Sequence, residues 1–242
     1  MNQAALLLFC GAVLTSQPAT PPQFRLSYVG EVDRSLGSVV LERLRTTYRE
    51  YEERFGFGPQ GVIRIVLTGE AAFTPSRFPD WAAGINDGTI RVPVRGLEEP
   101  NSSLDRLIRH ELAHSFLSSK TGGNCPTWLQ EGVAQWLEGG DPEREDEGVA
   151  EKLATGGLLA LHTLEAPFYE RAEPDVRLAY AASLSATAHL LRTRGVQGLI
   201  RLIESLGAGV PSDDALTQAI GMSYADFQRT WEQHLAALAR DG

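Results

Sequence analysis

The chain of 242 residues has only two cysteines and no excess of positive charge. The first feature argues against a fold stabilised by disulfides, and the second against a protein that binds polyanions. Its cysteines are Cys10, inside an N-terminal apolar segment, and Cys125. If that segment is removed on export, no disulfide can form within the chain, so the fold rests on its core and any metal. The formal net charge of −9 argues against a nucleic-acid or anionic-membrane binder, because such a protein needs a basic face.

The sequence also lacks an apolar N-terminal run long enough to cross a bilayer. The run Ala4–Leu14 has eleven residues, too few for a stable membrane span but typical of the core of a secretory signal. No charged side chain precedes Arg25, so the basic start that is usual in signals is missing. We predict that residues 1–23 are a cleavable signal peptide with a Pro-rich joint, and that the protein is secreted or periplasmic. The alternative is a disordered apolar tail.

Residues 24–100 show the patterns of a small α/β unit. Alternating apolar residues predict a strand at 24–30, and a run of residues that favour β structure predicts another at 62–69. Apolar residues at three- and four-residue spacing predict an amphipathic helix between them, over 36–55. The segment 81–94 is typical of a hairpin, with Asn86-Asp87-Gly88 at its turn. We expect a small mixed sheet with one helix on it.

Residues 101–242 are predominantly helical in pattern, so the predicted fold class is α+β. Asn101 and the two serines after it are N-cap residues for a helix, and a second helix begins near Pro126. The charged stretch 141–148 is most simply a solvated loop. Further helices are predicted at 176–194, 196–207, 212–220 and 223–239.

The stretch LIRHELAHSFLSS at 107–119 carries the strongest chemical signal. His110 and His114 are four residues apart, about one helical turn, so they lie one above the other on the same helix face. Two imidazoles in that register can chelate one cation. Glu111 lies beside the first histidine, where its carboxylate can reach a water on that cation. The alternative is a surface helix whose polar residues lie on its solvent-exposed face.

A candidate third ligand, Glu131, lies seventeen residues beyond His114, in the stretch WLQEGVAQWLE. Catalytic zinc takes three protein ligands and leaves a fourth position for water. Glu131 lies among apolar residues, where a carboxylate is costly to bury unless it is paired or bound to a cation. Gly132 and Ala134 beside it leave room for close approach of another helix. We therefore predict one Zn²⁺ per chain on His110, His114 and Glu131; for Glu131 a helix-end salt bridge is the alternative.

HELAH followed by WLQEGVAQWLE resembles the gluzincin zinc metallopeptidases of the thermolysin-like clan, especially their small bacterial peptidase-MA-like family. The match is strongest over 104–138. It implies a zincin-like fold, with residues 24–242 forming a single catalytic domain. No Gly-x-Met-Glu-Asn stretch of the exopeptidase type precedes the motif, so the resemblance favours an endopeptidase with a peptide or protein substrate.

The resemblance also implies roles for particular residues. Glu111 is the general base that acts on a metal-activated water during hydrolysis of a peptide bond. Tyr180 is at the place where such enzymes add a donor to the oxyanion. The stretch GTIRVP at 88–93 is an edge strand able to pair with an extended substrate.

Several alternatives stay open at the level of sequence. Tyr180 is either this donor or a core residue with its hydroxyl satisfied, and Glu138 either orients a ligand histidine or ends its helix in solvent. The other histidines, His162, His189 and His234, lack partners at ligand spacing, and Cys125 is expected to be a small buried hydrophobe. Two other functions remain compatible with the motifs: an inactive binding or assembly module, and a hydrolase of a non-peptide amide or ester.

Overall fold

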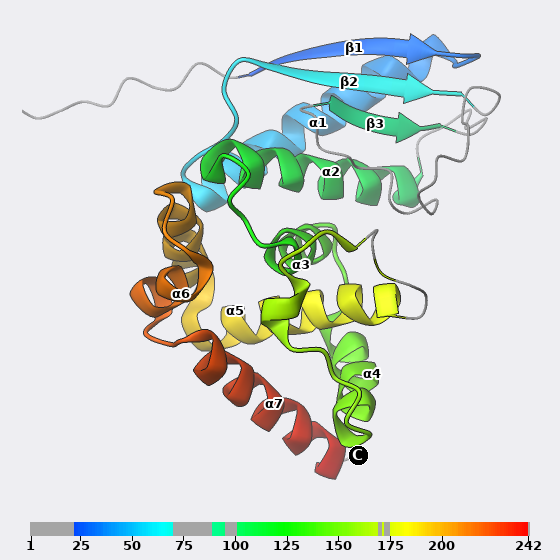
Figure 1. Ribbon diagram of the computed structural model, residues 1–242. Coiled ribbons are helices and arrows are strands. Elements are labelled where there is room, and N and C mark those ends of the chain that lie inside the picture. The colour runs from blue at the N-terminus through cyan, green and yellow to red at the C-terminus, as the bar shows by residue number, and fades with distance from the viewer. Residues whose placement is uncertain (1–21, 70–88, 95–100, 169–170, 172–174, 242) are drawn as a thin grey trace, which may run out of the picture.

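The computed structural model describes residues 22–69, 89–94, 101–168, 171 and 175–241, and within them the chain is a mixed α+β structure that is mostly helical (Figure 1). The strands are β1 (Gln23–Val29), β2 (Val62–Thr68) and β3 (Thr89–Pro93). The helices are α1 (Arg34–Phe55), α2 (Ser102–Thr121), α3 (Thr127–Leu137), α4 (Pro142–Ala154), the 3-10 helix η2 (Leu161–Leu164), α5 (Asp175–Gly207), α6 (Ser212–Ile220) and α7 (Tyr224–Asp241).

The described strands form one sheet in the order β1-β2-β3, and both pairings are parallel. The sequence predicts a mixed sheet, with an antiparallel hairpin over 81–94. Only its second half, β3, lies among the described residues, and β3 pairs with β2 in parallel. The predicted first strand and turn of that hairpin lie outside the described residues, as does the predicted signal segment up to residue 21.

Helices α1 and α2 cover one face of the sheet, as Figure 1 shows. Val40 and Leu44 of α1 are fully buried, together with Ile65 and Leu67 of β2. Because the side chains of a strand alternate between its two faces, the same strands send their other residues to the uncovered side. The sheet therefore positions α2, the helix that carries the two histidines, beneath it.

Local signals start and end α2, and it starts where the sequence predicts. The side chain of Asn101 accepts a hydrogen bond from the Leu104 backbone N–H at 2.9 Å, which satisfies one of the free donors at the helix start. Gly122 ends the helix in the left-handed conformation at φ 61°, which glycine adopts without steric cost. The two histidines are thereby placed in the middle of an uninterrupted helix.

The prediction of a solvated loop at 141–148 is wrong, because these residues begin helix α4. Asp141 is its N-cap: its Oδ1 accepts hydrogen bonds from the backbone N–H groups of Glu143 and Arg144 at 3.1 and 3.3 Å. Pro142 suits the first helical turn, and acidic residues in that turn interact favourably with the positive end of the helix dipole. The charge of this stretch is therefore a helix-start signal.

The remaining helices follow the predicted pattern. Helix α5 is interrupted at Gly195, whose φ of 65° and ψ of 178° separate it into the two predicted segments. Trp231 of α7 is fully buried and donates a hydrogen bond from Nε1 to Ser185 Oγ of α5 at 2.8 Å. None of the described helices combines the length and apolarity needed to span a membrane.

Candidate metal centre and active site

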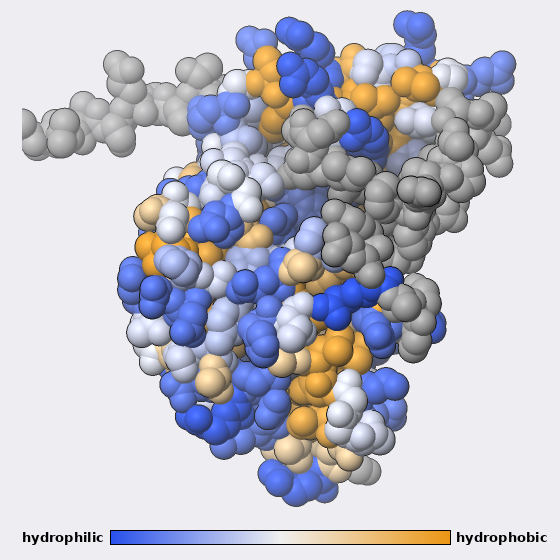
Figure 2. Space-filling model, in the orientation of Figure 1, coloured by the Kyte–Doolittle hydropathy of each residue, from blue (hydrophilic) through white to orange (hydrophobic). Residues whose placement is uncertain are grey.

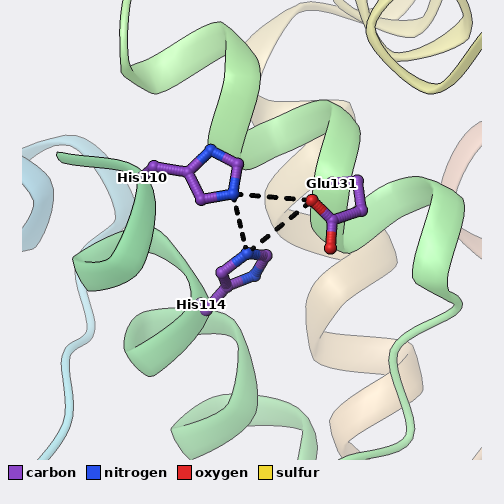
Figure 3. A group of neighbouring side chains, drawn as sticks. All are labelled: His110, His114 and Glu131. Atoms are coloured by element: carbon purple, nitrogen blue, oxygen red, sulfur yellow. Dashed lines mark hydrogen bonds and ion pairs between the residues drawn. The ribbon is translucent and has the colours of Figure 1, made fainter. Parts of the chain in front are cut away.

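Three side chains from two helices converge on one point, as Figure 3 shows. His110 and His114 come from α2 and Glu131 comes from α3. The Nε2 atoms of the two histidines are 3.0 Å apart, and Glu131 Oε2 lies 3.5 Å from His110 Nε2 and 3.8 Å from His114 Nε2. Two ligand atoms of a tetrahedral zinc ion lie about 3.3 Å apart. The donor atoms therefore have the spacing that a single cation requires.

Close packing of α3 against α5 positions Glu131. A Cβ atom on Gly132 would overlap the backbone oxygen of Ser183 and the Oγ1 of Thr187, both on α5, so only glycine permits this approach. On the same helix Trp128 and Val133 are fully buried in the core. Glu131 is thereby held on the side of α3 that faces α2, and the predicted close approach at Gly132 is present.

The chemistry of the donor set fits a cation. Glu138 Oε2 lies 2.9 Å from His110 Nδ1, so this carboxylate accepts the Nδ1–H and leaves the Nε2 lone pair directed toward His114 and Glu131. His114 is buried, and its Nδ1 has no hydrogen-bond partner among the described residues. Two imidazole lone pairs and a carboxylate oxygen that face one another in a buried place suit a divalent ion, which satisfies all three.

The protonation states of the cluster are strongly perturbed. Burial lowers the pKa of His114 to about 4, so this ligand is neutral at pH 7. Burial alone would raise the pKa of Glu131, but the two neighbouring histidines hold it below its usual value. Burial likewise opposes charge on His110, yet its hydrogen bonds with Glu131 and Glu138 raise its pKa. A cation bound here would therefore compete with a proton on His110.

Glu111 lies beside the cluster and is only 6% exposed. Burial raises the pKa of its carboxyl to about 7, against the opposing charge of His110. A carboxyl group whose pKa is near neutrality can both accept and release a proton at physiological pH. Its position next to the converging ligands and its pKa suit a general acid–base group.

A cleft of about 610 Å³ lies beside the cluster. Its walls include His110, Glu111, Gln135, Glu138 and Tyr180. Tyr180 of α5 is held from two sides: its backbone oxygen accepts a hydrogen bond from Gln135 Nε2 at 3.0 Å, and its ring packs edge-on against Phe168 at 5.2 Å between centroids. Burial and the carboxylates of Glu131 and Glu111 raise its pKa, so the hydroxyl keeps its proton. The structure thus brings Tyr180 to the same cleft as Glu111.

The structure also shows which of the other candidate residues lie at the ligand cluster and which do not. Of the two alternatives for Glu138, the structure favours contact with a ligand histidine over a solvated helix end. Cys125 is buried away from the cluster, and burial raises the pKa of its thiol. The three remaining histidines are not part of the cluster among the described residues.

Sequence reasoning missed Arg109, which ties the ligand helices together. Its guanidinium makes two hydrogen bonds to the carboxylate of Glu50 on α1, at 2.7 and 2.8 Å, and its Nε donates to the Leu137 backbone oxygen at the end of α3 at 2.8 Å. Glu50 is 59 residues away along the chain, so no local pattern reveals the pair. Arg109 anchors α2 to both of its neighbours directly beside His110.

Comparison with known proteins agrees with this site. The sequence model of the Peptidase MA superfamily matches residues 70–237, and the chain belongs to that superfamily. Membership points to a peptidase, and the cluster of His110, His114 and Glu131 is compatible with a metal-dependent one. No curated protein and no solved structure matches the chain.

Proposed function

We propose that the protein is a zinc-dependent metallopeptidase of the gluzincin type that cleaves internal peptide bonds. The observation that carries the proposal is the convergence of His110, His114 and Glu131 beside a cleft whose walls include His110 and Glu111. Its membership of the Peptidase MA superfamily supports the same reaction class. A structural zinc site takes four protein ligands, whereas the described residues here offer three, which leaves one position for the reaction.

His110, His114 and Glu131 would hold the ion, and Glu138 would hold the His110 ring in its ligand tautomer. When bound, zinc supplies a Lewis acid for the scissile carbonyl and for the attacking water. Zinc is the ion of choice for a set of two imidazoles and one carboxylate that leaves a coordination position open.

Glu111 is the proposed general base. Its carboxylate takes a proton from the attacking water and later delivers that proton to the leaving amine, so the same group acts first as base and then as acid. Burial raises the pKa of Glu111, whereas a bound dication would lower it, so the carboxylate is the form that takes the proton from the water. The burial that raises this pKa also keeps bulk water from competing for the proton.

Tyr180 is the proposed donor to the oxyanion that forms on the former carbonyl oxygen. Its raised pKa keeps the phenol protonated, so the hydroxyl can donate rather than repel the developing negative charge. Its contact with Phe168 and the hydrogen bond of its backbone oxygen to Gln135 hold the ring at the wall of the cleft.

The variant Glu111→Gln tests the proposal. Glutamine has nearly the same shape but no basic carboxylate, so we expect normal folding and zinc content with cleavage of an unfolded protein reduced on the order of 10²–10⁴-fold. Zinc per chain and the cleavage rate are measured on the same samples, with wild-type protein plus chelator as a control. An inactive binding module would show no cleavage in the wild type, and an esterase or amidase would cleave small esters or amides but not the protein. Wild-type cleavage rates in Glu111→Gln would refute the mechanism.

A further inference from the structure

The uncovered face of the sheet has a charge opposite to that of the whole chain. Arg25 of β1 and Arg64 of β2 alternate with the more buried residues of their strands, so both are on the face that α1 and α2 leave uncovered among the described elements. The three strands contain no aspartate or glutamate. In a protein of net charge −9, this is a local basic surface that the overall composition does not predict.

Arg25 and Arg64 are direct neighbours across the β1–β2 pairing. Adjacent strands lie about 4.8 Å apart, so two guanidinium groups leave the sheet side by side and repel each other. Both are exposed, and neither has an ion-pair partner among the described residues. Glu31, the first carboxylate along the chain after Arg25, comes only after β1 has ended. An external anion would relieve this repulsion.

Apolar side chains lie on the same face. Val29 is 46% exposed and Val62 is 36% exposed, and they are two of the three exposed large hydrophobic residues in the described part of the chain. By strand alternation Val29 shares a face with Arg25, and Val62 shares one with Arg64. Figure 2 shows hydrophilic and hydrophobic residues next to one another along the top of the molecule, over the strands. Exposed valines among arginines combine an apolar contact with an electrostatic one.

We propose that this uncovered sheet face, made of Arg25, Arg64, Val29 and Val62, docks on an anionic phospholipid surface. Lipid headgroups supply the missing negative charge, and the layer beneath them accepts the valines, which a nucleic-acid backbone would leave in water. The proposal stands apart from the proposed peptidase activity and does not depend on it.

The distribution of acidic residues permits this docking despite the net charge. Helix α4, which contains Glu143, Glu145, Asp146, Glu147 and Glu151, lies at the opposite end of the molecule from the strands (Figure 1). At physiological ionic strength, charges further apart than about 8 Å are largely screened. In the docked orientation α2 and the metal centre lie on the far side of the sheet from the lipid, so the cleft remains accessible.

Vesicle sedimentation of the full chain tests the proposal. Binding to vesicles of phosphatidylglycerol mixed with phosphatidylcholine is compared with binding to phosphatidylcholine alone, at about 0.1 M salt and millimolar lipid. The apolar run Ala4–Leu14 is the same in every variant, so the readout is the ratio of the two affinities, compared between variants. Each arginine near an anionic surface contributes about 1 kcal/mol, or about fivefold. Arg25→Gln with Arg64→Gln should therefore lower the ratio on the order of 25-fold.

Two further variants control for charge and position. Arg25→Lys with Arg64→Lys keeps both charges and should keep the preference for anionic vesicles. Arg45→Gln with Arg49→Gln removes two exposed arginines from α1 and should change the ratio less than twofold. All variants should retain wild-type cleavage of a soluble substrate, which separates this result from that of Glu111→Gln.

Three outcomes would overturn the proposal. The first is a ratio near one for the wild-type chain. The second is an equal loss of anionic-vesicle binding in the α1 variant and in Arg25→Gln with Arg64→Gln. The third is arginine-dependent binding to a single-stranded oligonucleotide without binding to vesicles, which would assign the face to nucleic acid instead.

Discussion

Replacement of Glu138 should weaken zinc binding although Glu138 is not a proposed ligand. Its Oε2 accepts the Nδ1–H of His110 at 2.9 Å, and its Oε1 accepts a hydrogen bond from Arg106 at 3.0 Å. Burial alone would raise the pKa of Glu138, but these two partners hold it below its usual value, so the group is anionic at neutral pH. In Glu138→Ala the ring of His110 loses both its orientation and the negative charge that makes Nε2 a better donor.

The size of the effect follows from the contact. A hydrogen bond to a charged group contributes about 1.5–3 kcal/mol, which corresponds to roughly 10–150-fold in an equilibrium constant. Carboxylates in this position typically change metal affinity by about 10–100-fold. The Glu138 side chain is 17% exposed, so little water can replace the lost acceptor. We expect the zinc dissociation constant of Glu138→Ala to rise by about 10–100-fold.

Competition with a chromophoric chelator at pH 7 measures this constant directly. Arg106→Gln is the matched control, because it removes the other partner of Glu138. The Arg106 side chain is 58% exposed, and an exposed ion pair contributes at most about 1 kcal/mol, so its effect should stay below about fivefold. Unchanged zinc affinity in Glu138→Ala, or an equal loss in Arg106→Gln, would refute the reasoning.

Three further predictions concern catalysis and folding. Tyr180→Phe should lower kcat by about 10²-fold with little change in KM, measured by steady-state cleavage; near-normal kcat would assign Tyr180 to packing alone. Gly132→Ala should destabilise the fold by at least about 1–3 kcal/mol in urea denaturation, since its Cβ would meet the backbone of Ser183; an unchanged midpoint would refute this close approach. Burial lowers the pKa of His189 to about 4, so the unfolded chain binds a proton between pH 6.5 and 4 that the native state excludes. The contribution of neutral His189 to the free energy of unfolding is complete above pH 6.5 and should fall by about 2 kcal/mol from pH 7 to 5. His189→Gln should therefore flatten the dependence of the free energy of unfolding on pH, and an unaltered dependence would contradict the lowered pKa of His189.

Where an interaction spans a few residues, the sequence predicted it well. The register of His110 and His114 follows from helical periodicity, and the start of α2 follows from the cap at Asn101. The wrong prediction at 141–148 is also local in origin: the stretch contains the helix-start residues Asp141 and Pro142, but its high charge is equally typical of a solvated loop. The basic face of the sheet could not be predicted from the sequence, because the pattern within each strand does not show that Arg25 and Arg64 become neighbours when β1 pairs with β2.

What the sequence by itself determined is therefore the pair of histidines on one helix face, the glutamate between them and the class of the fold. Only the tertiary structure decided how the distant groups come together: Glu131, the third ligand that the sequence predicts, and Glu138, for which the sequence leaves two roles open. Glu131 reaches the histidines because Gly132 lets α3 pack tightly on α5, and Glu138 turns to His110 because α3 ends beside α2. Helix periodicity specifies neighbours within one or two turns, whereas contacts between helices depend on side-chain packing across the whole core, which no local pattern encodes.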